Sequence, residues 1–412
     1  MNRPAGWVAS LIVGGPLVAL GLGVLALRGR PPQAPPPVAA GALKGANVLL
    51  VTVDGLRPDH LGAYSRDGAL TPTLDRFAKD GIYLARAYSH VPVSRPSVRT
   101  ILSGVYPDRA DAPAALAARL AAVGYRTGAF VGSRDLAAGR DGLATGFDRY
   151  DDLLPDNEAS RSAEEVFAAA LAWAAAPAPS DRPPAPVAQS PGSRSEPPAP
   201  AVQVPAPWFL WVHLSDPNPP YQPPASFAAR SDLEGYDGEI AYVDSALLGF
   251  LTGLRRTGVF GRTLVTIAST YGDALGEHGE ASHGSLAYDA TLRVPVILWA
   301  PPQLGAGLVA PTTRLIDLAP TIVDLVAAAP IDGADGRSIL PLLGPSAAGD
   351  RESYFEVNGM RGVVKGGRKL IAGRTPELYD LEADPEERHN QYRPGSAEER
   401  ELEDLLDRIA GR

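Results

Sequence analysis

The chain has 412 residues, of which 45% are hydrophobic, so it can bury a large core as one α/β domain or as two smaller domains. Its net charge of −9 argues against a nucleic-acid partner, because neutralising phosphates requires clustered Lys and Arg. The sequence has no cysteine, which excludes disulfides, thiolate catalysis and Cys-ligated metal centres.

The N-terminal region contains an uncharged apolar run, Trp7–Leu27. Its length suits a helix that crosses a hydrocarbon core of roughly 30 Å. We therefore expect residues 1–30 to be a single-pass membrane anchor, with the rest of the chain on one side of the membrane. A cleaved signal sequence is the alternative, because a weak small-residue cleavage site occurs near VAAGA.

Two Pro-rich segments follow. Residues 31–45 form a Pro and Ala linker, which we expect to be an extended spacer. Residues 176–207 contain too much proline for a helix or strand and cannot bury apolar surface, so we expect a disordered surface insert. A linker between two domains is the alternative, and it is disfavoured because strands and helices alternate in the same style on both sides.

Residues 46–345 alternate between apolar runs and helical patterns. Strands are expected at 47–53, 127–132, 209–214, 263–269 and 294–300, and helices at 73–81, 114–124, 163–176 and 236–258. This alternation is typical of an α/β domain with a doubly wound, mostly parallel sheet flanked by helices. Functional residues gather at the carboxyl ends of such strands. Residues 346–412 carry hairpin strands and a final helix, which predicts a small C-terminal α+β part.

Two side chains lie at the ends of predicted elements. Asp54 follows the first strand, where its carboxylate would project from the sheet edge as a metal ligand; a turn or N-cap aspartate is the structural alternative. Ser94 lies just before Pro96, at the expected start of a helix. There, unpaired N–H groups and the helix dipole would favour an attacking alkoxide, whereas a simple Ser N-cap is the structural alternative.

Several blocks occur in one order over roughly residues 46 to 385, among them VTVDGLRPDHLGAY, HVPVSRPSVRTILSGVYP, WVHLSDPNPPYQPP, ASTYGDALGEHGEASHG and DLAPTIVDL. Together they resemble the sulfatase family of the alkaline phosphatase superfamily. The resemblance implies the alkaline phosphatase fold and a divalent metal, usually calcium, held by the Asp after the first strand and by two residues after a later strand. It also implies a nucleophile that is either a formylglycine made from Cys or Ser, or an unmodified Ser or Thr.

Mapped onto this family, Asp54 holds the first metal position and Ser94 the nucleophile position. The arginine of the family's nucleophile motif is replaced by Val98, and Arg99 lies one residue late, about 100° away on a helix. Conversion of Ser94 to formylglycine is therefore doubtful, and an unmodified serine is the better expectation.

The loop Ala268–Gly284 holds the largest departure. Where the family carries two metal ligands, this chain has Thr270 and Tyr271, a neutral hydroxyl and a phenol. Calcium needs six to eight oxygen ligands and charged carboxylates among them, so its affinity should fall by orders of magnitude. Only a shift of the loop that brings Asp273 beside Asp54 would restore a plausible centre.

The histidines are also altered. Asn218 replaces the family histidine of the D-P-H-x-P-Y motif, and an amide cannot act as an acid or base at neutral pH. His283 matches a histidine that lies near the substrate in relatives with one Asp, so it is a candidate catalytic residue beside Ser94. His213, in the apolar run FLWVHL, is expected to be a satisfied core histidine.

The sequence thus predicts a sulfatase-like protein whose catalytic constellation is incomplete. We favour a non-catalytic binding role, with an active hydrolase or transferase that uses Ser94, His283 and a metal on Asp54 as the alternative. An active enzyme would take a small-molecule or glycan sulfate or phosphate ester. By the family's habit of working outside the cytoplasm, we expect the anchored domain to be exported. The sequence identifies no protein partner.

Overall fold

The computed structural model describes residues 33–65, 70–109, 115–139, 142–154, 158–176, 206–228, 235–344 and 349–411. The expected membrane anchor and most of the Pro-rich insert lie outside these residues. Within the described part of the chain, no helix is both long and apolar enough to cross a membrane. Residues Ala34–Arg412 form one compact unit.

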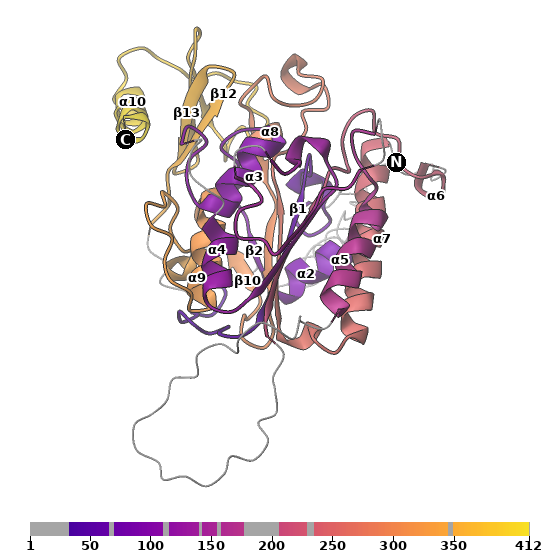
Figure 1. The fold of residues 1–412 in the computed structure, drawn as a ribbon. Coiled ribbons are helices and arrows are strands. Elements are labelled where there is room, and N and C mark those ends of the chain that lie inside the picture. Colours follow the sequence, from indigo (N-terminus) through magenta and orange to yellow (C-terminus); the bar gives the residue numbers. More distant parts are fainter. Residues whose placement is uncertain are drawn as a thin grey trace, which may run out of the picture. The chain divides into compact units, whose positions relative to one another are not determined.

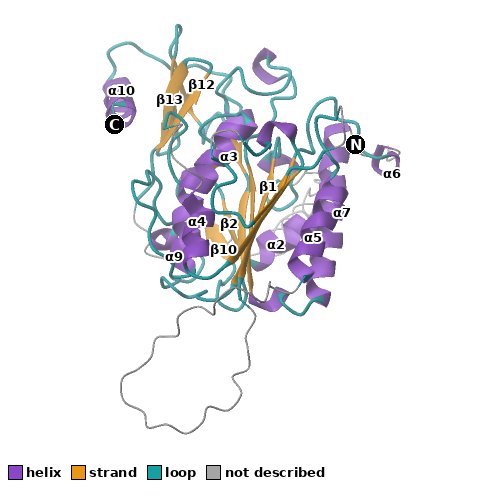
Figure 2. Cartoon of the chain, in the orientation of Figure 1, coloured by secondary structure: helices purple, strands orange, loops and turns teal. Residues whose placement is uncertain are grey.

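An eight-stranded sheet forms the centre of this unit (Figures 1 and 2). Its strands, in spatial order, are β10 (Gly307–Val309), β2 (Ile82–Leu84), β9 (Val296–Trp299), β7 (Thr263–Ser269), β1 (Asn47–Val53), β6 (Trp208–Leu214), β4 (Arg126–Val131) and β5 (Arg149–Asp151). All neighbours are parallel except β9, which is antiparallel to both β2 and β7. The expected doubly wound, mostly parallel sheet is confirmed.

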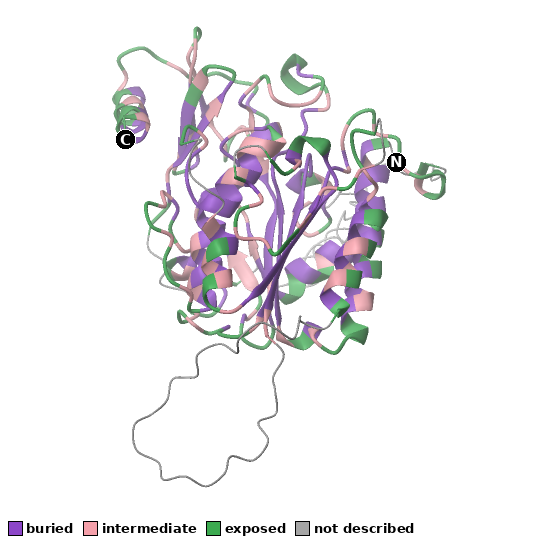
Figure 3. Cartoon of the chain, viewed as in Figure 1, coloured by how far each residue is buried: buried purple, intermediate pink, exposed green. Residues whose placement is uncertain are grey.

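Helices cover both faces of the sheet, as Figure 1 shows. One face packs against α3 (Ser94–Ser103), α4 (Ala115–Ala122) and α9 (Leu318–Leu325), and the other against α2 (Pro72–Asp80), α5 (Ala163–Ala175) and α7 (Gly235–Arg256). Strand β1 shows why both faces are apolar: Val48 and Leu50 join the first core, while Leu49 and Val51 join the second. The central strands β1, β6 and β7 are accordingly buried along their length (Figure 3).

The remaining elements are short or lie in the C-terminal part. A small sheet joins β11 (Thr313–Arg314), β3 (Ala87–Tyr88) and β8 (Arg293–Val294), and two short helices are α6 (Ala225–Ala228) and α8 (Asp289–Leu292). The 3-10 turns are η1 (Pro58–His60), η2 (Arg134–Leu136), η3 (Phe260–Arg262), η4 (Glu277–Gly279), η5 (Leu315–Asp317) and η6 (Leu340–Leu342).

The C-terminal part is an antiparallel sheet of β12 (Ser353–Val357), β13 (Met360–Lys365), β14 (Arg368–Ala372) and β15 (Glu377–Asp380), followed by α10 (Ala397–Ala410). It shares apolar cores with the main domain. Tyr106 and Ile316 pack with Leu405 in one cluster, and Tyr88 packs with Phe355 in another. The C-terminal sheet is therefore built into the same unit as the large sheet.

The residues just before β1 do not form a free spacer. The backbone N–H of Gly41 donates to the carbonyl of Asp324 at 2.7 Å, and that of Leu43 donates to the carbonyl of Leu325 at 2.8 Å. The Leu43 side chain is buried in the main core, and the ring of Pro36 lies on Gly305. We call Ala34–Ala46 the N-terminal strap, because it is fastened to the domain rather than extended from it.

Candidate functional site

The site lies where β1 and β7 end. The two strands are parallel, with Val53 opposite Ser269, so Asp54 and Thr270 leave the sheet side by side at its carboxyl edge. The N–H of Thr270 donates to the carbonyl of Val53 at 2.9 Å, which keeps the two segments in register beyond the ends of the strands. The carboxylate of Asp54 is completely buried.

Both oxygens of the Asp54 carboxylate already have partners. The hydroxyl of Ser94 donates to Oδ2, and the hydroxyl of Thr270 donates to Oδ1. Nε2 of His213 lies 3.3 Å from Oδ2. Burial raises the pKa of Asp54, but the charge of His213 and these hydrogen bonds outweigh it, so the pKa of Asp54 lies below its ordinary value. Asp54 is therefore a satisfied, ionised carboxylate.

His213 is buried, as expected of a core histidine, but it also belongs to the site. Its Nδ1 lies 3.0 Å from the hydroxyl of Thr52, which accepts a 2.9 Å hydrogen bond from Nε1 of Trp211. Strand β6 places it there by pairing with β1 so that His213 lies opposite Thr52. His213 is recognised as a site residue by its position opposite Thr52, one residue before the end of its strand. Its apolar sequence neighbours do not reveal this.

Ser94 is the first residue of α3 and is half-buried. Besides its bond to Asp54, its Oγ lies 3.2 Å from the phenol oxygen of Tyr271. Val98, at the family's arginine position, is fully buried in the apolar core of that helix face. The predicted nucleophile thus does reach Asp54, without the arginine that accompanies it in the family motif.

Tyr271 fills the place next to Ser94 and Asp54. Its side chain is 1% exposed, and its ring packs against that of His283 with centroids 4.4 Å apart. Burial and the negative charge of Asp54 raise the pKa of Tyr271 well above its usual value. The phenol is therefore neutral, and a bulky uncharged group occupies a position that holds a metal ligand in the family.

The Asp273 carboxylate is directed to Ser282 and His283 rather than to Asp54. It is completely buried, and its Oδ2 accepts from the hydroxyl of Ser282 at 3.3 Å and lies 3.5 Å from Nδ1 of His283. The carbonyl of Asp273 accepts from the Arg57 guanidinium at 3.0 Å. His283 thus contacts Asp273 and Ser282 and reaches the Ser94 region through the contact of its ring with the Tyr271 ring, which is tilted by 39°.

These residues do not fit a divalent metal. Of the two residues that are hydrogen-bonded to the Ser94 hydroxyl, Asp54 is the one that carries a charge. Both of its carboxylate oxygens already accept hydrogen bonds from hydroxyl groups. Among the described residues, no group of three or more His, Asp or Glu side chains could hold a metal ion. Calcium requires six to eight oxygen ligands, which Thr270 and the neutral phenol of Tyr271 cannot supply.

The loop after β6 packs against Gly55, which explains why a glycine follows Asp54. Gly55 has φ of +73°, and a Cβ at this position would meet the carbonyl oxygen of Pro217 at 2.4 Å. A second carboxylate at this position, common in the family, has no room here. Asn218 follows in the same loop, and its Oδ1 is buried with no hydrogen bond to any described residue.

Two carboxyl groups with raised pKa values lie in and beside this loop. Burial raises the pKa of Asp216 to about 6. Burial and the nearby negative charge of Asp216 raise the pKa of Glu239, on α7, to about 7. Glu239 therefore carries a proton in the folded protein at a pH where the unfolded chain has released it.

Replacing Glu239 by Gln is expected to stabilise the protein at about pH 8 by about 1 kcal/mol after solvent screening, with little effect at about pH 4.5. Because the folded-state pKa is raised, the wild type loses stability as the pH rises from 4.5 to about 7, and the Gln variant escapes this loss. Urea unfolding at both pH values measures the difference. Glu164→Gln, at an exposed position of α5, should not show this gain at about pH 8, and an equal effect of E239Q at both pH values would contradict the assignment.

A cleft of about 540 Å³ adjoins the site, lined by His60, Pro220, Tyr221, Gly235, Tyr236, Asp237, Leu275, Gly276 and Ala281. Nδ1 of His60 lies 2.7 Å from Oδ1 of Asp237, and the His60 ring meets the Tyr236 ring edge-on at 4.9 Å. The Tyr236 hydroxyl donates to the carbonyl of Gly55 at 2.6 Å, which connects the cleft wall to the Asp54 turn. The sequence did not identify this cleft.

This chain resembles known proteins in both sequence and fold. The sulfatase family model matches residues 46–328. Arylsulfatase A of Homo sapiens is 24% identical over 421 residues, which cover 84% of this chain and 83% of that protein. A protein solved in complex with k-i-k-neocarrahexaose superimposes with a TM-score of 0.70 at 19% identity, covering 89% of this chain and 93% of that one.

Phosphonate monoester hydrolase of Agrobacterium radiobacter superimposes with a TM-score of 0.66 at 19% identity, covering 89% of this chain and 95% of that one. These structural likenesses establish the fold, while the family model covers most of the described domain. The chain therefore belongs to the sulfatase family of the alkaline phosphatase superfamily.

Proposed function

We propose that this protein is a membrane-anchored, exported pseudosulfatase. It binds a glycan but does not catalyse the sulfuric ester hydrolysis typical of its family. One observation carries the proposal. The carboxylate that would hold the metal, Asp54, is saturated by the hydroxyls of Ser94 and Thr270, and the neutral phenol of Tyr271 is buried beside them.

The loss of hydrolysis follows from the groups that are absent. Ester hydrolysis in this family requires charge stabilisation on the ester oxygens and a proton donor for the leaving group. For the charge stabilisation, this chain lacks a metal site. At the position of the proton donor it has Asn218, which cannot transfer a proton at neutral pH. Removing one such group typically costs on the order of 10²–10⁴ in rate.

The membrane anchor rests on the apolar run Trp7–Leu27, which has the length and composition of a single span. Among the described residues, no helix has the length and apolar composition needed to span a bilayer. Export of the globular part agrees with the extracytoplasmic role expected of the family.

The ligand class follows from the cleft next to the site. Tyr221 offers aromatic surface for sugar rings, and the His60–Asp237 pair offers polar atoms for hydroxyl groups. The carboxylates of Asp237, on the cleft wall, and of the buried Asp273, beyond Tyr221, disfavour a ligand that carries a negatively charged sulfate group. We therefore propose an uncharged sugar in preference to its sulfate ester. The carrahexaose complex of the structural relative supports the glycan class.

An active hydrolase remains the second candidate, favoured by one observation. Ser94 is half-buried at the start of α3, and its hydroxyl donates to a carboxylate. In that case Ser94 would be the nucleophile and would require a metal or another cation near Asp54.

We expect the purified full-length protein to contain no stoichiometric calcium, zinc or manganese, and to release no product from 4-nitrophenyl sulfate, 4-nitrophenyl phosphate or N-acetylglucosamine 6-sulfate. We expect unsulfated N-acetylglucosamine oligosaccharides to give a saturation-transfer NMR signal with the same protein. Elemental analysis, product release and NMR together test the proposal, because the cleft retains its aromatic wall while the site has lost its metal ligands.

The matched controls separate the two candidates. Tyr221→Ala should abolish the NMR signal, whereas Tyr221→Phe keeps the ring and should retain it. Bound metal together with turnover that Ser94→Ala abolishes would establish the active hydrolase. A stronger NMR signal from the 6-sulfate than from the unsulfated sugar would contradict the proposed ligand class.

A further inference from the structure

The amino ends of the central strands carry a group of cations. Lys44 lies three residues before β1, and Arg262 directly precedes β7; the first residues of these strands, Asn47 and Thr263, lie opposite each other in the sheet. Asp54 and Thr270 follow the same two strands at their other ends. Because β1 spans seven residues at about 3.3 Å each, roughly 20 Å separates these cations from the functional site.

Two further arginines extend this group. Arg255 and Arg256 end α7, and the guanidinium of Arg255 lies 4.8 Å over the ring of Phe260 in η3. We call Lys44, Arg255, Arg256 and Arg262 the basic face. The first three are exposed and Arg262 is half-exposed.

The basic face is not neutralised locally. Within the described ranges, none of its four residues forms an ion pair within 4.0 Å. On the neighbouring helix α2, the carboxylate of Asp80 is directed to Arg76 at 3.4 Å. In a chain with a net charge of −9, four unpaired cations at one end of the sheet constitute a marked charge asymmetry.

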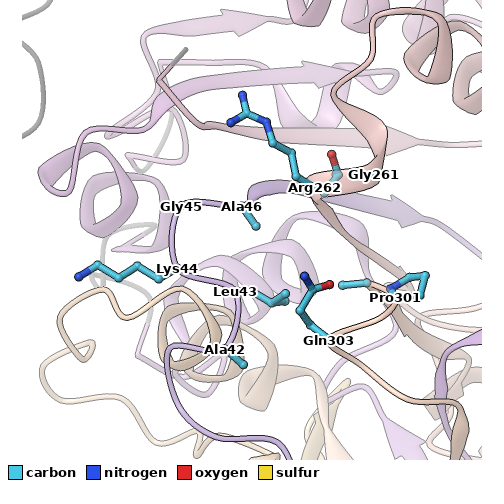
Figure 4. A pocket seen from close by; sticks show the side chains of 11 residues that line it. Ala42, Leu43, Lys44, Gly45, Ala46, Gly261, Arg262, Pro301 and Gln303 are labelled. Carbon is cyan, nitrogen blue, oxygen red and sulfur yellow. The ribbon is translucent and has the colours of Figure 1, made fainter. Parts of the chain in front are cut away.

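The strap borders a cleft beside this face. The cleft has a volume of about 270 Å³ and is lined by Ala42–Ala46, Gly261–Thr263, Ala300, Pro301 and Gln303. Figure 4 shows the side chains of Lys44 and Arg262 extending outward from its rim on two different sides. Their charges are thus directed to the surroundings rather than to each other.

The strap also fixes where the chain enters the domain. Gly41 and Leu43 are hydrogen-bonded to the end of α9, and the ring of Pro36 lies on Gly305, two residues from the cleft residue Gln303. The chain therefore joins the domain at the end of the sheet that carries the basic face. Residues 28–34, which connect the apolar run to the strap, span at most about 25 Å when fully extended.

We propose that the basic face lies against an anionic membrane surface, so that the glycan cleft and the Asp54 site are directed away from the bilayer. This inference rests on the membrane anchor proposed above. The short tether holds the face within reach of the lipid headgroups, and anionic lipids attract clustered Lys and Arg close to the surface. The attraction is screened at high salt, since the Debye length falls from about 10 Å at 0.1 M to about 3 Å at 1 M.

The chain's lack of cysteine allows a direct test on the full-length protein. Thr257→Cys places a fluorescent label beside the basic face, and Ser285→Cys places one in the exposed loop at the opposite end of the strands. Each labelled protein is reconstituted into vesicles of phosphatidylcholine with or without phosphatidylglycerol, which carry a nitroxide-headgroup quencher. With phosphatidylglycerol at low salt, quenching at position 257 should exceed that at position 285 severalfold, and high salt should reduce the difference.

A charge variant and its control complete the test. Neutralising the basic face with Lys44→Gln, Arg255→Gln, Arg256→Gln and Arg262→Gln should bring the quenching ratio close to one. The control neutralises four exposed arginines of the C-terminal part and should retain the ratio: Arg361→Gln, Arg374→Gln, Arg388→Gln and Arg393→Gln.

Flotation of the vesicles distinguishes the two proposals. A protein that floats but is quenched equally at both positions, or that keeps its severalfold quenching ratio after the basic face is neutralised, keeps its anchor and overturns the orientation. A protein that does not float with either lipid composition overturns the anchor, and the orientation with it.

Discussion

Replacing Thr270 by Asp and Tyr271 by Asn is expected to create a calcium site. The side chains of both positions already converge on the Asp54 and Ser94 cluster, through hydrogen bonds from Thr270 to Asp54 and between Tyr271 and Ser94 at 3.2 Å. The double variant adds a carboxylate and an amide oxygen and removes the phenol that fills the space. Calcium at 100 times its Kd should then stabilise the variant by about 2.7 kcal/mol and leave the wild type unchanged.

Calcium-dependent thermal unfolding measures this gain, and the neutral pair Thr270→Asn/Tyr271→Asn is the matched control. It has the same volumes and no added charge, so calcium should not stabilise it. Without calcium, the Asp variant should be the least stable of the three, because two buried carboxylates then face each other. A calcium-dependent rise in the melting temperature of the wild type would show that the native residues do hold the metal.

The sequence predicts the frame of the site because that frame depends on local patterns. Strands β1 and β7 begin and end where the apolar runs do, at 47–53 and 263–269, since both are buried on two faces. Their parallel pairing then places Asp54 and Thr270 at one edge. The presence of Thr270 and Tyr271 at the positions where the family resemblance implies metal ligands is likewise read from the sequence, because it is a matter of residue type at positions fixed by the family blocks.

The sequence does not predict the contacts that depend on pairing between distant segments. The run FLWVHL indicates a buried histidine, but the 3.3 Å approach of His213 to Asp54 requires β6 to lie beside β1. The apolar composition of β9 likewise does not predict that this strand runs antiparallel to its neighbours. The strap has the proline content of a spacer, yet Leu43 is captured by the core, and residue composition does not reveal such a docking surface.

Replacing Lys369 by Met is expected to destabilise the protein by about 3–5 kcal/mol. Lys369, on β14, is completely buried, and its ammonium lies 2.9 Å from Asp289 and 2.8 Å from Glu387. Burial lowers the pKa of Lys369, but these two carboxylates outweigh it, so its pKa is raised and the lysine stays charged. Removing the ammonium leaves two buried carboxyl groups without a counter-charge, which urea unfolding should register as a large fall in the midpoint.

Lys365 provides the matched control, because it lies on the adjacent strand β13 and pairs with Glu401 at 3.1 Å, with both side chains substantially exposed. Lys365→Met should cost no more than about 1 kcal/mol. The neutral triple variant Asp289→Asn/Lys369→Met/Glu387→Gln should recover much of the loss, since no unpaired charge remains. Equal costs for Lys369→Met and Lys365→Met would contradict the buried triad. Because the triad joins the C-terminal sheet to α8 of the main domain, we expect the Lys369 variant to unfold both in a single transition at lower urea.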